Sequence, residues 1–218
     1  AEIVFKRAPE LKQKIKIVYN PLPEVSGITK KPSDPTFLYL SGDGYFKGFH
    51  IFLKASACTL QKGFKRNSNV QFLITKDLRD ISKLAVEKLN VRFNRAYDLL
   101  GYLAYEEVLK LHSISRALLF PSIWEEPLPY TVIESMLAGT IPIASRVGGV
   151  PEIVNGTFAE RMLFEPDNVE KLIDKMESVL SLSMEQIIDI GKSLRENILK
   201  QFNSYTIRKQ LRSIVICD

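Results

Sequence analysis

Short apolar runs alternate with longer amphipathic stretches along most of the chain. Each run is a few residues long and ends at Gly, Pro, Ser or Asp, which is typical of strands buried on both faces of a parallel sheet. A weaker extended piece is expected near Met162–Phe164. Six runs are predicted as strands: Ile15–Tyr19, Thr36–Leu40, Val70–Thr75, Asp98–Gly101, Ala117–Phe120 and Ile141–Ala144.

Apolar positions at helical spacing fill the intervals between these strands. Asp167 or Asn168 is expected to cap the fifth helix, and Ser183 the sixth. This alternation predicts an α/β fold: a single Rossmann-like, doubly wound, mostly parallel six-stranded sheet with helices on both faces. The predicted helices are Gly48–Gln61, Leu78–Leu89, Tyr105–Ser113, Tyr130–Ala138, Val169–Leu180, Met184–Lys200 and Tyr205–Ile216.

Composition narrows the class of protein without naming a function. A chain of 218 residues, 45% hydrophobic, suits one large α/β domain and is short for two. No apolar run reaches the roughly 18 residues that a membrane-spanning helix needs. Two cysteines and two histidines offer no metal-ligand spacing, so no metal is expected. We therefore expect a cytoplasmic protein, with peripheral attachment to the inner membrane face left open.

Basic residues gather in three stretches, and the net charge is +5. The stretches are Lys6–Lys16, Lys62–Arg66 and Arg208–Arg212, and Phe64 is the single aromatic residue within them, so there is no regular aromatic interleaving. Solvated helix faces explain such stretches most simply, and docking to an anionic membrane is the alternative. Nucleic acid is not expected as a partner.

The loop after the fifth predicted strand combines a helix start with two carboxylates. In a doubly wound sheet, ligands bind beyond the carboxyl ends of the strands. Free N–H groups at Tyr130, Thr131 and Val132, together with the helix dipole, predict an anion site there. Glu126 precedes the helix and Glu134 lies inside it, less than about 12 Å apart along the axis. A nucleotide sugar, with hydroxyls on both sides of its phosphates, fits this order.

These residues resemble the EX7E motif of retaining glycosyltransferases of family 4 (group 1), which have the GT-B fold. The motif runs from Glu126 over seven residues to Glu134 and is followed by Gly139-Thr140-Ile141-Pro142. The resemblance extends to the segments 17–21, 101–102 and 145–154. It implies that residues 15–200 are a donor-binding domain. It further implies that residues 1–14 end a linker from a missing N-terminal domain, and that residues 201–218 form a helix that crosses to that domain.

The resemblance also implies residue roles. Glu126 binds donor sugar hydroxyls and Glu134 the ribose, with Leu128, Tyr130, Thr131 and Val132 beside them. In the glycine-containing loop Ser41–Gly48, Lys47 pairs with the donor diphosphate; Lys47 and Glu126 are the catalytic candidates. Gly42 and Gly44 let the backbone approach a phosphate. Gly101 and Tyr102 lie where the base of the donor nucleotide is held, and the sequence does not indicate which base this is. The family's usual loop arginine is replaced by Asp43 and Phe46, and Arg146 is the candidate substitute.

The sequence thus predicts a retaining, hexosyltransferase-type enzyme that takes a sugar from a nucleoside-diphosphate donor without metal or other cofactor. The acceptor, a lipid-linked or soluble glycan, would bind the missing domain, so the isolated chain is expected to bind nucleotide weakly and to transfer nothing. Three alternatives stay open. These are an epimerase or phosphorylase on the same fold, a non-catalytic nucleotide-sugar-binding module, and a charge-driven binder of lipid or nucleic acid.

Overall fold

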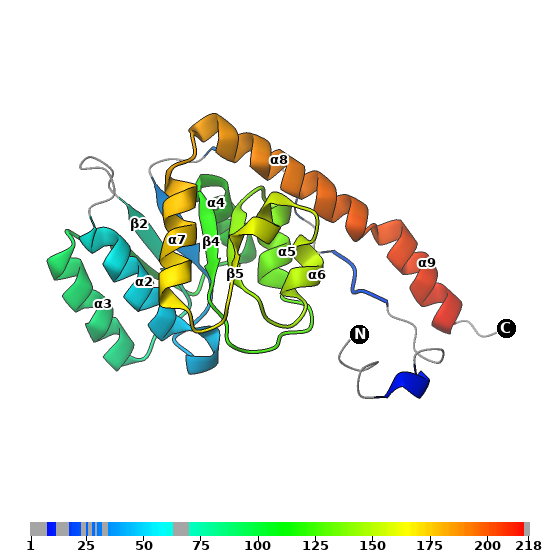
Figure 1. Ribbon diagram of the computed structural model, residues 1–218, viewed down its shortest axis with the longest axis horizontal. Helices are drawn as coiled ribbons and strands as arrows, with labels where there is room; N and C mark the ends of the chain where they lie inside the picture. The colour runs from blue at the N-terminus through cyan, green and yellow to red at the C-terminus, as the bar shows by residue number, and fades with distance from the viewer. Residues whose placement is uncertain are drawn as a thin grey trace. The chain divides into compact units, whose positions relative to one another are not determined.

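A computed structural model describes residues 8–11, 18–22, 25, 28, 30–31, 35–62 and 70–215 (Figure 1). The chain divides into two compact units, one of them Val25–Ile198 and the other Ala1–Glu24 together with Leu199–Asp218. The sequence-based division after residues 14 and 200 stays a prediction. None of the described helices is long and apolar enough to cross a membrane.

The larger unit is built on one six-stranded sheet, in which every strand pair is parallel. The strand order is β3-β2-β1-β4-β5-β6, the doubly wound arrangement. This confirms the predicted fold class. The strands are β1 (Thr36–Tyr39), β2 (Gln71–Thr75), β3 (Tyr97–Gly101), β4 (Ala117–Phe120), β5 (Ile141–Ser145) and β6 (Leu163–Phe164).

One predicted strand, Ile15–Tyr19, falls mostly on residues that the structure does not describe. Of Ile15–Tyr19, residues 15–17 lie outside the described residues, and Val18 and Tyr19 are not in a strand. The sixth strand is instead β6, the weaker extended piece near Met162–Phe164. Only two residues of β6 pair, with Ala144 and Ser145 of β5, and so short a strand shows little pattern in a sequence.

All seven predicted helices are present, with ends shifted by up to three residues. Asn168 caps α7, since its side chain accepts from the Lys171 N–H at 2.9 Å. Ser183 caps α8, since its hydroxyl accepts from the Gln186 N–H at 3.2 Å. Helix α6 and the 3-10 turns were not predicted because they span less than two helical turns. The helices are α2 (Phe49–Gln61), α3 (Asp80–Arg92), α4 (Tyr105–Ile114), α5 (Tyr130–Leu137), α6 (Val150–Val154), α7 (Val169–Leu180), α8 (Met184–Gln201) and α9 (Ser204–Val215), with 3-10 turns η1 (Pro9–Leu11), η2 (Tyr45–Lys47) and η3 (Phe158–Met162).

The two faces of the sheet carry different side chains. On one face Tyr39 stacks on Phe52 of α2 with ring centroids 4.5 Å apart, and Phe37 stacks on Phe72 at 5.6 Å. Helix α7 packs beside α2 (Figure 1). The opposite face is aliphatic: buried Leu38, Leu40, Leu73 and Leu118 pack against Leu100 of β3 and Val108 and Leu111 of α4. This alternation along β1 follows from the two-residue period of a strand.

His112 of α4 is fully buried, and within the described part of the chain neither ring nitrogen has a hydrogen-bond partner. Burial, and to a smaller extent the nearby charge of Lys30, lowers the pKa of His112 from 6.5 to about 3. The folded state therefore keeps this imidazole neutral at pH values where the unfolded chain protonates it.

We expect His112 to make the protein less stable as pH falls. Its folded pKa lies below the unfolded value, so the unfolded chain binds the extra proton between pH 6.5 and about 3. The free energy of unfolding should fall in that window by about 1.4 kcal/mol per pH unit beyond the slope of a His112→Leu variant. Urea unfolding of both proteins from pH 6.5 to pH 4.5 measures this difference. Equal slopes would contradict it.

Candidate functional site

The sheet reverses its winding direction between β1 and β4, its two central strands. Strand β2 lies on one side of β1, whereas the second half of the sheet extends from the other side. In such sheets the crevice for a ligand opens at this switch point, above the carboxyl ends of the strands. Two loops border it: 40–48 after β1 and 121–129 after β4. Both were selected from the sequence.

Backbone contacts hold these two loops against each other. The Ile123 N–H donates to the Phe46 carbonyl at 2.9 Å, and the Ser122 hydroxyl donates to the same oxygen at 3.1 Å. The Phe46 and Trp124 rings meet edge to face, 5.5 Å apart. Gly48 has φ +71°, and a Cβ there would overlap the Pro121 carbonyl. Only glycine therefore allows the β1 loop to lie this close to the end of β4.

Lys47 and Glu126 form an ion pair across the crevice, Nζ to Oε1. Lys47 ends the turn η2 in the first loop, and Glu126 lies in the second. The Lys47 side chain is 43% exposed and that of Glu126 is 21% exposed, so a ligand can reach both. The fold thus brings together the two residues that the sequence selected as catalytic candidates, which lie 79 positions apart.

A third loop, after β5, packs onto the Glu126 segment. The Gly149 N–H donates to the Glu126 carbonyl at 2.9 Å, and the Gly148 N–H donates to the Glu125 carboxylate. A Cβ at Gly148 would overlap the Glu126 backbone, and one at Gly149 would overlap the Pro127 carbonyl. The two adjacent glutamates are thereby distinguished: Glu125 is used to hold the loops together, and Glu126 pairs with Lys47.

Helix α5 begins at the crevice without a side-chain cap. Its N-cap residue is Pro129, and no side chain accepts from the first turn. The expectation of a free amide at Val132 was wrong, because the Val132 N–H donates to the Pro129 carbonyl at 3.0 Å. The Thr131 amide has no partner among the described residues and, with the helix dipole, remains available to an anion. Tyr130 is exposed, and Leu128 is half-buried in the same loop.

Glu134 lies one turn inside α5 and meets Tyr105, the first residue of α4. Burial raises the pKa of Glu134, and the hydrogen bond from Tyr105 opposes that rise. Burial and the neighbouring Glu134 carboxylate together raise the pKa of Tyr105 to about 12. The sequence did not identify Tyr105, because no local pattern reports a contact across 29 positions. A half-buried carboxylate with one donor retains acceptor capacity for a ligand hydroxyl.

Asp43 occupies a place where the resemblance implies an arginine, and the structure gives it a different task. Its carboxylate accepts from the Arg79 backbone N–H and Nε, both at 2.9 Å, and from the Ser82 hydroxyl at 2.6 Å. These hydrogen bonds lower the pKa of Asp43 against the effect of burial. They join the first loop to the start of α3. Gly42 and Gly44 flank Asp43, and a Cβ would meet nothing closer than 3.7 Å at either.

Arg146 follows β5 and Gly101 ends β3, so these two predicted site residues lie at strand ends that are separated in the sheet by β2, β1 and β4. The Arg146 Nε lies 3.4 Å from the Glu165 Oε1, in an exposed ion pair. The positive charge of Arg146 is therefore partly neutralised by the Glu165 carboxylate. At the end of β3, the Gly101 carbonyl accepts from the Lys76 N–H at 2.6 Å, and Tyr102 is 74% exposed. An exposed tyrosine at that place is open to stacking on a base.

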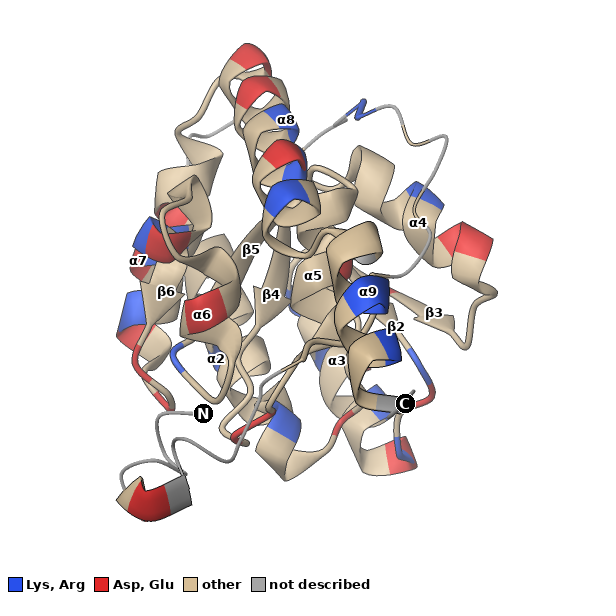
Figure 2. Ribbon diagram, turned by 90° about the vertical axis from the view of Figure 1, so that its right-hand side faces the viewer, with Lys and Arg blue, Asp and Glu red and all other residues tan. Residues whose placement is uncertain are grey.

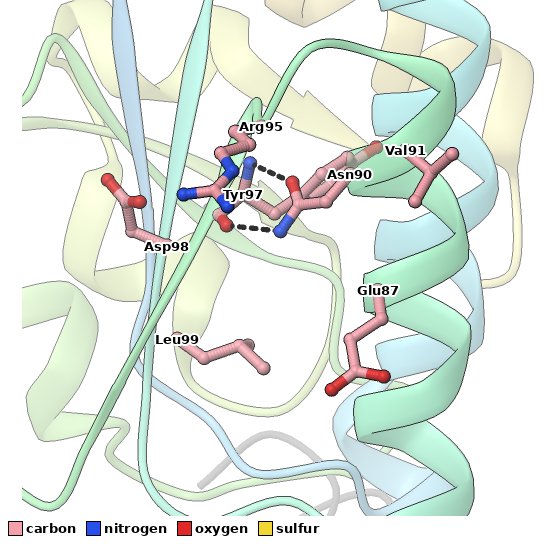
Figure 3. A pocket seen from close by; sticks show the side chains of 7 residues that line it. All are labelled: Glu87, Asn90, Val91, Arg95, Tyr97, Asp98 and Leu99. Atoms are coloured by element: carbon pink, nitrogen blue, oxygen red, sulfur yellow. Dashed lines mark hydrogen bonds between the residues drawn. The ribbon is translucent and has the colours of Figure 1, made fainter.

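A separate hollow of about 430 Å³ lies between α3 and the edge strand β3 (Figure 3). Glu87 and Leu99 border it, and the Asn90 amide bonds both backbone groups of Tyr97 at 2.8 Å (Figure 3). That side chain takes the place of a neighbouring strand at Tyr97 and so covers part of the sheet edge. None of the residues lining the hollow was predicted as a site residue. Within the described residues, no cluster of three or more His, Cys, Asp or Glu side chains could hold a metal ion.

Sequence comparisons match most of the chain to one family. A model described as Glycosyl transferases group 1 matches residues 24–198. An uncharacterized glycosyltransferase of Methanocaldococcus jannaschii is 27% identical over 136 residues. The GDP-Man:Man(3)GlcNAc(2)-PP-Dol alpha-1,2-mannosyltransferase of Mus musculus is 30% identical over 162 residues. These alignments cover 61% and 70% of this chain but 33% and 31% of the relatives, so the chain spans about a third of their length.

Solved structures share the fold at low sequence identity. A TarM mutant of S. aureus in complex with UDP superposes with a TM-score of 0.76 at 16% identity, covering 95% of this chain and 42% of TarM. Anabaena HepE in complex with UDP and glucose gives a TM-score of 0.67 at 20% identity, covering 84% of this chain and 48% of HepE. At such identities the likeness shows the fold alone, which is that of one GT-B domain.

Proposed function

The chain belongs to the glycosyl transferases group 1 family, and we propose that it is the nucleotide-sugar-binding part of a retaining enzyme that transfers a hexose from a nucleoside-diphosphate donor. The single observation that carries this proposal is the pairing of Lys47 with Glu126 across the switch-point crevice, beside the uncapped start of α5. A cation, a free backbone amide and a carboxylate then lie together at the place where a doubly wound sheet binds ligands.

Each group has a role in this proposal that follows from its chemistry. Lys47 and the α5 N-terminus stabilise the negative charge that grows on the departing diphosphate. Glu126 accepts hydrogen bonds from the donor sugar and holds it in the reacting orientation. Glu134 accepts from the ribose. Gly101 and Tyr102 border the base. No nucleophile, metal or other cofactor is assigned, and the acceptor, a lipid-linked or soluble glycan, is assigned to a further domain beyond this chain.

A non-catalytic nucleotide-sugar-binding module is the second candidate. Asp43 and Phe46 stand where the family arginine is expected, and Asp43 is committed to Arg79 and Ser82. One cation, Lys47, would then face the diphosphate. Joining this chain to an acceptor-binding domain and finding donor binding without turnover would favour the module. Release of free nucleoside diphosphate and an altered sugar without acceptor would favour an epimerase instead.

A thermal-shift panel tests donor binding by the 218-residue chain. We expect one nucleoside-diphosphate sugar among UDP-glucose, GDP-mannose and ADP-glucose to raise the unfolding midpoint by about 5–10 °C at a hundred times its Kd. The free monosaccharide alone should give no shift. Absence of a shift with every nucleotide sugar would contradict the proposal, as would transfer to an acceptor by the isolated chain.

A Gly44→Ala variant should change nucleotide affinity without changing the stability of the fold. Gly44 has φ −64° and ψ 137°, which alanine also adopts, and a Cβ there would contact Lys47 Cγ at an ordinary 3.7 Å. We expect an unchanged midpoint without ligand. A phosphate resting on this loop would meet the new methyl group, weakening nucleotide binding by about 1–3 kcal/mol. Calorimetric titration measures the affinity. Unchanged affinity would move the phosphate away from residues 42–44.

A further inference from the structure

Glu134 is a half-buried carboxylate that meets no cation among the described residues. Its neighbours Ile133, Ser135 and Met136 are buried in α5, whereas Glu134 keeps partial exposure. In the described part of the chain no Lys, Arg or His forms an ion pair with Glu134. Helix α5 itself has no Lys or Arg, and no blue is drawn on it in Figure 2. Because a carboxylate in such a place needs donors, Glu134 has acceptor capacity that the described fold leaves unused.

Tyr105 is the side chain that bonds Glu134 in the described structure, and it is a neutral donor. Its hydroxyl donates to the Glu134 carboxylate. Burial and that carboxylate raise the pKa of Tyr105 to about 12, so the phenol keeps its proton at neutral pH. A phenol donates one hydrogen bond, whereas the two oxygens of an ionised carboxylate accept about four. About three acceptor sites therefore remain, which is enough for two hydroxyls of a ribose.

The first turn of α4 fixes the position of Tyr105. The Ala104 N–H donates to the Glu107 carboxylate at 2.8 Å, and the Ala104 carbonyl accepts from the Glu107 and Val108 N–H groups at 3.0 and 3.1 Å. Farther along the helix, Val108 and Leu111 pack against the aliphatic face of the sheet. The Tyr105 hydroxyl is therefore presented by a packed helix, which makes it suited to hold another side chain in one orientation.

The segment that ends in Tyr105 begins at the place that the proposed function gives to the base. Gly101 ends β3, Tyr102 follows it, and α4 begins at Tyr105. A nucleoside joins its base directly to its ribose, so the contacts to these two parts must be adjacent. Residues 101–105 meet this condition, because they border the proposed base position at one end and contact Glu134 at the other.

We propose that Tyr105 is a positioning residue for the donor ribose: its hydroxyl holds the Glu134 carboxylate so that the remaining acceptor sites face the ribose hydroxyls, and the site thereby selects ribonucleotides over 2′-deoxyribonucleotides. This role rests on the proposed donor site. A ligand without the 2′-hydroxyl leaves a half-buried acceptor unpaired, which is the costly case for a hydrogen-bonding site. The Tyr105 bond also opposes the rise in the pKa of Glu134 that burial causes, and the ionised form is the stronger acceptor.

Calorimetric titration of the full chain with UDP, GDP, ADP and their 2′-deoxy counterparts tests the proposal. We expect the native chain to bind the preferred ribonucleotide about 10- to 100-fold more tightly than its 2′-deoxy form. Tyr105→Phe removes the hydroxyl and keeps the ring. It should reduce this affinity ratio about 5- to 10-fold, mainly by weakening the ribonucleotide.

Two controls separate positioning from a structural role. Tyr97→Phe removes a different hydroxyl, which bonds the Ser56 Oγ at 3.0 Å in the core; this variant should unfold at a lower temperature and keep the native affinity ratio. Glu134→Ala should bring the ratio close to one, and adding Tyr105→Phe to it should change the ratio no further. Thermal unfolding of each variant confirms that it folds.

The possible failures point to different conclusions. If Glu134→Ala lowers the ratio and Tyr105→Phe does not, or if Tyr97→Phe lowers it as much as Tyr105→Phe, the role of Tyr105 is overturned and the donor site stands. Equal affinity of the native chain for both nucleotides also overturns that role. If no nucleoside diphosphate binds, or if Glu134→Ala keeps the native ratio, the ribose contact in the proposed function fails together with it.

Discussion

Replacing Lys47 by methionine is expected to weaken binding of a nucleoside diphosphate by about 10- to 100-fold. Methionine keeps the apolar stem but removes the only charge that the first loop offers to a phosphate at this crevice. A hydrogen bond to a charged group contributes about 1.5–3 kcal/mol, which gives that range of affinity. Calorimetric titration with the diphosphate and with the unphosphorylated nucleoside measures the effect. Only the diphosphate should lose affinity.

Two further variants serve as controls for the expected effect of Lys47→Met. Lys54→Met removes an exposed cation of α2 and should leave both affinities unchanged. Glu126→Gln frees Lys47 from its ion pair, so the diphosphate alone should bind at least as tightly as to the native chain. The nucleotide sugar should lose the part of its affinity that comes from the sugar. Equal effects of Lys47→Met on nucleoside and diphosphate would contradict the assigned role of Lys47.

Arg146 is tested in the same titration. Its ion pair with Glu165 must open or turn for the guanidinium to reach a phosphate. If Arg146 supplies the second cation, Arg146→Ala should weaken diphosphate binding and spare the nucleoside. If affinity is unchanged while Lys47→Met lowers it, Arg146 has no part in the donor site.

Replacing Gly48 by alanine is expected to destabilise the protein by about 3 kcal/mol or more, since the new Cβ would overlap the Pro121 carbonyl. The left-handed backbone, φ +71°, adds about 1–2 kcal/mol for a residue with a side chain. In a chain of this size the unfolding midpoint should fall by roughly 6–12 °C. Differential scanning calorimetry of the unliganded protein measures it.

Gly156→Ala provides the matched control for this variant. Gly156 has almost the same backbone, φ +70°, but its Cβ would meet no atom within 4 Å. Only the conformational cost, about 1–2 kcal/mol, should appear there. The difference between the two variants isolates the close packing of the first loop against β4. If both variants lost the same stability, that packing would not be needed to hold the crevice.

The fold was largely predictable because its signals are local and repeated. Each buried strand is a short apolar run, and each helix has its own period and often its own cap, as at Asn168 and Ser183. Where the signal was short, prediction was poor: β6 pairs through two residues, and α6 spans five. Of the predicted strand Ile15–Tyr19, only Val18 and Tyr19 are described, and neither is in a strand.

The candidate site was predictable only at the level of which loops form it. The rule for doubly wound sheets selects the strand ends, and these loops contain Lys47 and Glu126. The pairing itself, the use of Glu125 on Gly148, the contact of Tyr105 with Glu134, and the three bonds on Asp43 depend on residues far apart in the sequence. Neither hydrophobic periodicity nor helix-capping residues in the sequence indicate such contacts. They come from the packing of three loops onto one another.

A crystal of this chain soaked with the nucleoside diphosphate that gives the largest thermal shift would show where the donor binds. We expect the diphosphate between Lys47 Nζ and the Thr131 amide at the start of α5, the ribose on Glu134, and the Lys47 side chain turned from Glu126 toward a phosphate. Nucleotide bound at another strand end or in the hollow beside β3, with the Lys47–Glu126 pair intact, would contradict it.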